Sequence, residues 1–168
     1  KIFMDINYLA STKNYPDLHK CSVTVIGLGY VGLPLLNAFS KHYETVGFDI
    51  NTQRIRELSN GHDSTLELSK TELNKCQTIF TSEIEDLESA KIFIITVPTP
   101  IKKNNLPDLS FVINASTIVG KVMKKNNVVV YESTVYPGAT EEVFVPALEK
   151  NSGLKANRDF FYGYSPER

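Results

Sequence analysis

The chain has 168 residues, of which 42% are hydrophobic and 22% are charged, and its formal net charge is −1 at pH 7. These values match an ordinary globular domain with one sizeable core, and they exclude a disordered or collagen-like chain. Acidic and basic residues are scattered along the sequence, so we expect no nucleic-acid partner, which would require a basic stripe.

The predicted elements begin after residues 1–20, which lack the apolar core of a secretory signal and are expected to form a loosely attached N-terminal arm. In the single domain expected over residues 21–168, short β-rich runs alternate with segments of helical period. Several runs are apolar almost throughout, which is typical of strands covered on both faces. The alternation predicts a Rossmann-type α/β fold, a doubly wound, mostly parallel sheet with helices on both faces. The expected strands are Ser22–Gly27, Thr45–Asp49, Thr78–Thr81, Lys91–Val97, Val128–Ser133 and Phe160–Tyr164.

Helix signals separate these strands. Between the first two strands, five residues recur at helical spacing, which predicts a buried crossover helix. They are Val31, Leu35, Ala38, Phe39 and His42. Residues with N-cap or first-turn chemistry mark later helix starts at Asn51, Asp108 and Thr140. Over residues 62–77 we expect a loop followed by a short helix from Ser69. Pro146 is expected to kink the last of these helices.

The glycine spacing after the first strand predicts a dinucleotide site. Gly27, Gly29 and Gly32 form G-x-G-x-x-G at the opening of a helix, giving a tight turn, close approach to a pyrophosphate, and close helix–strand packing. Asp49 follows 20 residues after Gly29, where a carboxylate hydrogen-bonds the ribose hydroxyls and repels a 2′-phosphate. Together they favour NAD over NADP, although Arg54 nearby could tolerate a phosphate. A glycine-rich turn that binds nothing, or the similar loop of an adenosyl-methionine methyltransferase, is the alternative.

Three polar clusters follow later strands, and ligands in open α/β sheets bind at the carboxyl ends of strands. Thr99 and Thr134 would offer hydroxyls toward the cofactor, while Glu167 and Arg168 could meet a polar, phosphate-bearing substrate. Ordinary loop chemistry would explain any one cluster alone. The clusters are residues 97–100, 132–138 and 164–168.

Two further features limit the class of function. The longest apolar stretch, Ile92 to Val97, falls well short of the roughly 20 residues that a membrane span needs. The two cysteines, Cys21 and Cys76, lack the paired spacing of metal ligands or of a redox motif. We therefore expect a cytoplasmic protein with no membrane partner, no metal site and no disulfide.

Taken in order, the motifs resemble those of the UDP-glucose/GDP-mannose dehydrogenases, and the resemblance covers nearly everything from residue 22 onward. It implies the NAD-binding domain of an oxidoreductase that converts the C6 alcohol of a nucleotide sugar to a carboxylate. Residues 107–108 and 165–168 resemble the branch that acts on UDP-N-acetylhexosamines in Vi-antigen, capsule or O-antigen polysaccharide synthesis. The motifs that carry the resemblance are Gly27–Pro34, Gly47–Asn51, Val97–Pro100, Pro107–Leu109, Glu132–Gly138 and Ser165–Arg168.

The resemblance also implies roles for individual residues. Glu167 and Arg168 would border the UDP-sugar site, and Thr134 and Glu167 would lie near the reacting carbon as catalytic residues. The residues implied to contact NAD, besides the three glycines, are Tyr30, Val31, Asp49, Arg54, Thr99 and Thr134.

The implied mechanism needs groups that we do not expect in this chain. It comprises two hydride transfers to two NAD molecules, with a cysteine that holds the intermediate as a thiohemiacetal and then a thioester. Cys21 and Cys76 precede strands, so both should lie at the amino edge of the sheet, away from the cofactor. The resemblance places the catalytic cysteine and lysine, a dimerisation helix and a UDP-binding domain beyond Arg168, and it implies a full-length homodimer and an inactive fragment.

Three other functions remain open at this point. One is a UDP-glucose 6-dehydrogenase, and another is an NAD-dependent dehydrogenase of the hydroxyacid or 6-phosphogluconate type. The third is a non-catalytic NAD-binding module, which fits the fragment by itself. The clusters around Thr99, Thr134 and Glu167 argue against the second function.

Overall fold

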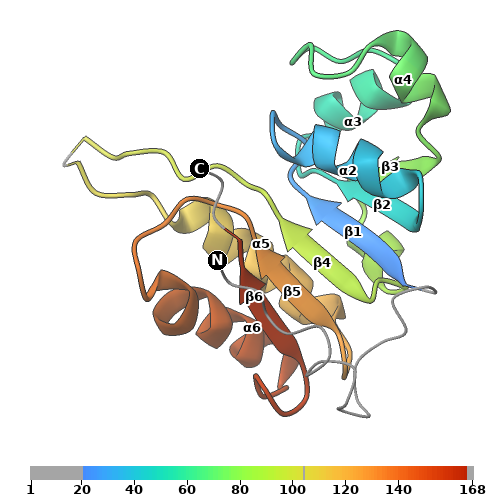
Figure 1. Cartoon of the computed structure of the whole chain (residues 1–168). Helices are drawn as coiled ribbons and strands as arrows, with labels where there is room; N and C mark the ends of the chain where they lie inside the picture. Colours follow the sequence, from blue (N-terminus) through green and yellow to red (C-terminus); the bar gives the residue numbers. More distant parts are fainter. Residues whose placement is uncertain (1–20, 104, 166–168) are drawn as a thin grey trace.

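The computed structural model describes residues 21–103 and 105–165 (Figure 1), so the expected arm lies outside the described residues. One six-stranded sheet has the order β3-β2-β1-β4-β5-β6, and every pairing in it is parallel. This confirms the predicted fold class and all the predicted strands, with ends that differ by a residue or two. The strands are β1 Ser22–Ile26, β2 Glu44–Phe48, β3 Thr78–Thr81, β4 Ile92–Ile95, β5 Val128–Tyr131 and β6 Phe161–Tyr164.

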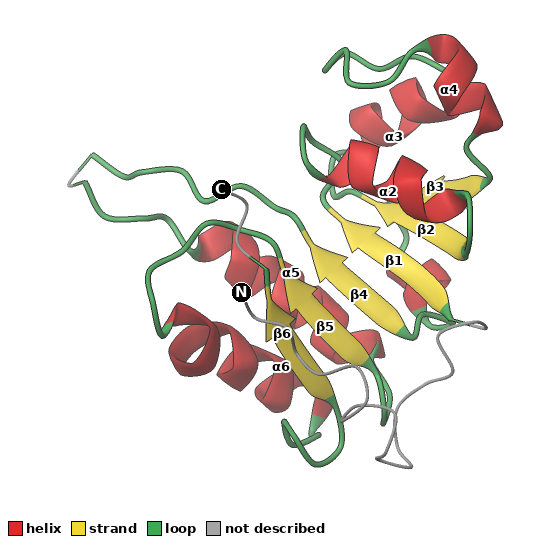
Figure 2. Cartoon of the chain, viewed as in Figure 1, coloured by secondary structure: helices red, strands yellow, loops and turns green. Residues whose placement is uncertain are grey.

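Helices cover both faces of the sheet because neighbouring strand residues point in opposite directions. In β1, Val25 packs with α2, α3 and α4 on one face, while Ile26 packs with α5 and α6 on the other. Figure 2 shows these two helical layers flanking the strands. The helices are α2 Gly32–Ser40, α3 Thr52–Ser59, α4 Lys70–Lys75, α5 Ser110–Val122 and α6 Val145–Ser152, with a 3₁₀-helix η2 at Ile84–Leu87 and a π-helix η3 at Thr140–Phe144.

Two of the predicted helix starts are confirmed, and both begin with hydrogen-bonded caps. The Asn51 side chain accepts from the N–H groups of Gln53 and Arg54 at 3.0 and 3.3 Å and so caps α3. Ser69 and Glu72 form a capping box that begins α4. Both caps satisfy N–H groups that have no partner within the helix.

The other two helix starts differ from the prediction. α5 begins at Ser110, and Asp108 accepts from the Ser110 N–H at 3.1 Å, one residue further from the helix than expected. The segment from Thr140 begins as the π-helix η3, and α6 follows with Pro146 in its first turn. Pro146 thus lies in the first turn of an α-helix, where its missing N–H costs little, directly after the π-helical segment. The expected kink stays a prediction.

The order of the strands creates a crevice. β1 connects outward to β2 and β3, whereas β4, β5 and β6 extend the sheet from the other side of β1. The loops after β1 and β4 therefore leave the sheet toward opposite faces, and this is where open α/β sheets bind ligands. In the described part of the chain, no helix is both long and apolar enough to cross a membrane.

Candidate nucleotide-binding site

A cleft of about 550 Å³ lies at the carboxyl ends of β1, β2, β4 and β5. The ends of these four strands lie side by side in Figure 1. Because the sheet is parallel, all four following loops reach the same edge. The cleft is lined by residues 26–31, 48–50, 96–99 and 132–134 and by Phe111, Asn114, Ala115 and Ile118 of α5.

The glycine loop after β1 forms one wall of the cleft. Gly27 has a positive φ of +96°, a conformation that side chains rarely adopt. A Cβ atom added to Gly32 would lie 1.9 Å from the Gly27 oxygen and 2.4 Å from Thr96 Oγ1. Only a glycine at this position therefore lets α2 pack this closely on the strand. A Cβ atom on Gly29 would meet nothing within 4 Å. As the spacing predicts, Gly27 forms the turn, Gly29 leaves open space beside the loop, and Gly32 allows close packing of helix and strand.

The start of α2 is suited to an anion. Its N-cap residue, Val31, makes no side-chain cap hydrogen bond, and the first turn contains no acidic residue. The N-terminal N–H groups and the positive end of the helix dipole attract phosphate. Tyr30 and Val31 line the cleft beside this turn, and Tyr30 is 71% exposed.

Asp49 stands at the end of β2 with its carboxylate fixed by backbone. Oδ2 accepts from the Leu28 N–H and Oδ1 accepts from the Asn51 N–H, each at 2.9 Å. A carboxylate has about four acceptor positions, so both oxygens can still accept from hydroxyls. Asp49 lines the cleft, and the residues present therefore fit the ribose and diphosphate of a dinucleotide.

Arg54 lies outside the lining of the cleft. Its side chain is buried, and Nε donates to the Leu28 carbonyl at 2.9 Å. Nη2 pairs with Asp63 Oδ1 at 2.8 Å, and the hydroxyls of Ser64 and Thr65 accept from Nη1 and Nη2. The structure thus places the guanidinium behind the glycine loop, and its direct contact with NAD stays a prediction.

The carboxyl group of Asp63 makes the stability of the fold depend on pH. Burial raises the pKa of its carboxyl, but hydrogen bonds from Thr65, Leu68 and Arg54 outweigh burial and hold the pKa well below its ordinary value of 3.8. A folded pKa below the unfolded one stabilises the fold above the ordinary pKa, and this stabilisation is lost as the pH falls toward the folded pKa.

We therefore expect the free energy of unfolding to fall below about pH 4, and to fall less in Asp63→Asn, which cannot titrate there. The variant should be the less stable protein at neutral pH, because an amide cannot accept all the hydrogen bonds that reach the carboxylate. Urea unfolding at a series of pH values would measure both effects. Parallel curves for the two proteins would contradict the assignment.

Hydroxyls join the loops after β4 and β5 on the opposite wall. Ser133 Oγ donates to the Val97 carbonyl at 2.6 Å, and Thr99 Oγ1 donates to the Thr134 carbonyl at 2.7 Å. The structure thus brings the predicted Thr99 and Thr134 together at the cleft. Because the Thr99 hydroxyl hydrogen is engaged, this side chain is left to act as an acceptor toward a ligand.

Some residues of the cleft were missed by the sequence reasoning. The cleft includes Glu132, which the sequence indicates only as part of a motif, and Phe111 and Asn114 of α5, which no sequence signal above predicts as site residues. With Ala115 and Ile118, the two α5 residues repeat at helical spacing beside the buried face of the helix. That spacing could have indicated a second, ligand-facing stripe. The predicted substrate residues, Glu167 and Arg168, lie outside the described residues.

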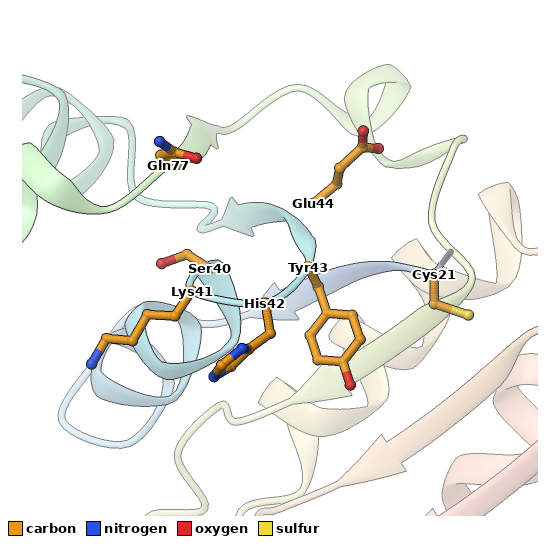
Figure 3. A pocket seen from close by; sticks show the side chains of 7 residues that line it. All are labelled: Cys21, Ser40, Lys41, His42, Tyr43, Glu44 and Gln77. Atoms are coloured by element: carbon orange, nitrogen blue, oxygen red, sulfur yellow. The ribbon is translucent and has the colours of Figure 1, made fainter. Parts of the chain in front are cut away.

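The two cysteines lie at the opposite edge of the sheet, as predicted. Cys21 directly precedes β1, and Cys76 lies two residues before β3 with its thiol donating to Ser40 Oγ at 3.3 Å. Cys21 lines a hollow of about 530 Å³ at this edge, formed with the end of α2 (Figure 3). No disulfide joins the pair. Neither thiol lines the nucleotide cleft.

The chain is similar to known proteins over nearly its whole length, well beyond the cleft. Residues 21–168 match the UDP-glucose/GDP-mannose dehydrogenase family, NAD binding domain. The chain is 57% identical over 147 residues to UDP-N-acetyl-D-glucosamine 6-dehydrogenase of Pseudomonas aeruginosa, covering 87% of this chain. It is 51% identical over 152 residues to the protein of the same name from Salmonella typhi, covering 90% of this chain. The matched regions are 35% and 36% of those proteins, so the chain spans about a third of their length.

Solved structures share the same fold. A GDP-mannose dehydrogenase ternary complex from Pseudomonas aeruginosa superposes with a TM-score of 0.81 at 28% identity, covering 87% of this chain and 36% of that one. The UDP-D-ManNAc dehydrogenase of Pyrococcus horikoshii gives a TM-score of 0.79 at 36% identity, with 88% and 36% covered. Each likeness extends over nearly the whole described domain.

Proposed function

The chain belongs to the UDP-glucose/GDP-mannose dehydrogenase family, as its NAD-binding domain, and from this we propose that it serves a UDP-N-acetylglucosamine 6-dehydrogenase of capsule or related polysaccharide synthesis. The observation that carries the proposal is the open space at Gly29 beside the fixed carboxylate of Asp49. The names of two relatives above 50% identity, those from Pseudomonas aeruginosa and Salmonella typhi, support the sugar.

Different residues of the cleft bind different parts of the dinucleotide. Asp49 accepts from the adenine ribose hydroxyls, and the start of α2 with Gly29 receives the diphosphate. Tyr30 and Val31 flank this turn, while Thr99 and Thr134 face the other end of the cofactor. NAD, when bound, supplies a hydride acceptor for oxidation of the sugar alcohol.

The reacting groups are shared with the rest of the full-length protein. We propose that Thr134 lies near the reacting carbon and that Glu167 and Arg168 border the nucleotide sugar. A thiolate nucleophile needs access to the cleft, and Cys21 and Cys76 belong to the other edge of the sheet. We propose, from the family resemblance, that a nucleophilic cysteine and a catalytic lysine come from other parts of a full-length protein. We propose further that this protein is a cytoplasmic homodimer.

The full-length protein provides the direct test. With UDP-N-acetylglucosamine and NAD, we expect absorbance from NADH and two NADH formed for each uronic acid released. The 168-residue chain alone should bind NAD but form no NADH, because neither Cys21 nor Cys76 lines the cleft.

Other outcomes identify the competing functions. Turnover of UDP-glucose in place of the acetylated sugar would assign a UDP-glucose 6-dehydrogenase. NAD binding by the full-length protein without oxidation of any UDP-sugar would instead support a non-catalytic module.

A further inference from the structure

Leu28, in the middle of the glycine loop, is held from both sides. Its N–H donates to Asp49 Oδ2 at 2.9 Å, and its carbonyl accepts from Arg54 Nε at 2.9 Å. The carbonyl contact is buried, so water competes little with the guanidinium there. Both peptide planes of Leu28 are therefore fixed by side chains from the β2–α3 segment.

Fixing the Leu28 carbonyl also fixes the next N–H group. In a planar trans peptide, the carbonyl of one residue and the N–H of the following residue point in opposite directions. With the Leu28 oxygen turned to Arg54, the Gly29 N–H is turned away from Arg54. Gly29 lines the cleft, with no atom within 4 Å of its would-be Cβ.

Arg54 is itself held by the loop that follows α3. Besides Nε on Leu28, Nη1 donates to Ser64 and Nη2 donates to Thr65, so all three guanidinium nitrogens have a partner. Asp63 pairs with Nη2 at 2.8 Å, and its side chain is fully buried. This arrangement holds the guanidinium behind the loop, outside the lining of the cleft.

The second oxygen of Asp63 anchors the same loop. Oδ2 accepts from the Glu67 and Leu68 N–H groups at 2.8 and 2.9 Å, and Oδ1 accepts from the Thr65 N–H at 3.0 Å. A carboxylate with this many donors cannot turn without losing several hydrogen bonds. The Arg54–Asp63 pair therefore has one defined geometry.

We propose that Arg54 is a positioning residue for the cofactor diphosphate: locked by Asp63, it holds the Leu28–Gly29 peptide so that the Gly29 N–H is presented to the anion. This rests on the proposed cofactor site and deepens it. In this role Arg54 acts through the backbone of the loop.

The test compares Arg54→Lys and Asp63→Asn with the wild-type chain by calorimetry. Each variant should bind NAD about tenfold more weakly, since a misdirected N–H removes one hydrogen bond to a charged group. Adenosine, which lacks the diphosphate, should bind both variants as it binds the wild type. Leu73→Ala is the matched control, because it opens the buried side of α4 and lowers stability without reaching the cleft.

An NMR titration of the wild-type chain keeps the proposal testable if the variants do not fold. Inorganic pyrophosphate should shift the Gly29 amide resonance strongly, and adenosine should leave it in place. An unmoved Gly29 amide, or folded variants with wild-type NAD affinity, would overturn the proposal. Equal losses for NAD and adenosine would overturn it too, by assigning Arg54 to the adenosine end. A wild-type chain that binds no NAD would overturn the cofactor site itself.

Discussion

Gly32→Ala is expected to destabilise the chain by about 3 kcal/mol or more, because the new methyl group has no room. It would lie 1.9 Å from the Gly27 oxygen and 2.4 Å from Thr96 Oγ1. The first of these atoms is backbone in a turn that Gly27 already holds at φ +96°, so relief requires moving α2 away from β1. The better helix propensity of alanine, worth about 1 kcal/mol, cannot compensate.

Gly29→Ala is the matched control and should separate folding from binding. Its methyl group would meet nothing within 4 Å, so the free energy of unfolding should stay within about 0.5 kcal/mol of wild type. NAD affinity should nevertheless fall about tenfold or more, because the methyl group occupies the approach of the diphosphate.

Urea unfolding and NAD calorimetry on both glycine variants would check these expectations. Gly32→Ala with wild-type stability would mean that α2 does not pack closely on the strand. Gly29→Ala with wild-type NAD affinity would mean that the diphosphate lies elsewhere.

The sheet could be read from the sequence because its determinants are local. Parallel strands covered on both faces are apolar almost throughout, as in 92–95 and 128–131, and these runs are short enough to separate from helices. The caps at Asn51 and Ser69 depend on residues two or three positions away. Each of these signals lies within a few residues of the element that it specifies.

The parts that sequence reasoning missed depend on contacts between distant segments. The sequence could not show that the Arg54 side chain is held by the Leu28 carbonyl and by the loop at Asp63. Likewise, Glu132 joins the cleft only because β5 pairs with β4, and Phe111 only because α5 packs beneath both. No local pattern encodes those pairings, whereas the spacing of the three glycines encodes the loop directly.

The π-helical hydrogen-bond pattern that begins at Thr140 could not be predicted for a different reason. Acidic residues in the first turn correctly indicated a helix start. They carry no information about the backbone hydrogen-bond register, which is π-helical over Thr140–Phe144. Phe144 at the end of this segment is fully buried and stacks on Tyr131 with ring centroids 5.1 Å apart. Pro146 then takes the first turn of α6.

Asp49→Ala is expected to weaken NAD binding by about 1.5 to 3 kcal/mol, or roughly tenfold to 150-fold, because it removes charge-assisted hydrogen bonds to the ribose. It also removes the acceptor of the Leu28 and Asn51 N–H groups, each at 2.9 Å. The melting temperature should therefore fall by a few degrees, and binding must be measured well below it. Glu44→Ala, at the opposite end of the same strand and exposed, is the control and should change neither quantity.

The same substitution should change the choice of cofactor. A carboxylate at the end of β2 repels a 2′-phosphate, so Asp49→Ala should lower NAD affinity more than NADP affinity and bring the two closer together. Arg54 remains paired with Asp63 in this variant, so the preference should weaken without reversing. Calorimetry with both dinucleotides measures the ratio. Unchanged NAD affinity in a folded Asp49→Ala chain would mean that the Asp49 carboxylate does not bind the ribose. The proposed basis for NAD selectivity would then be wrong as well.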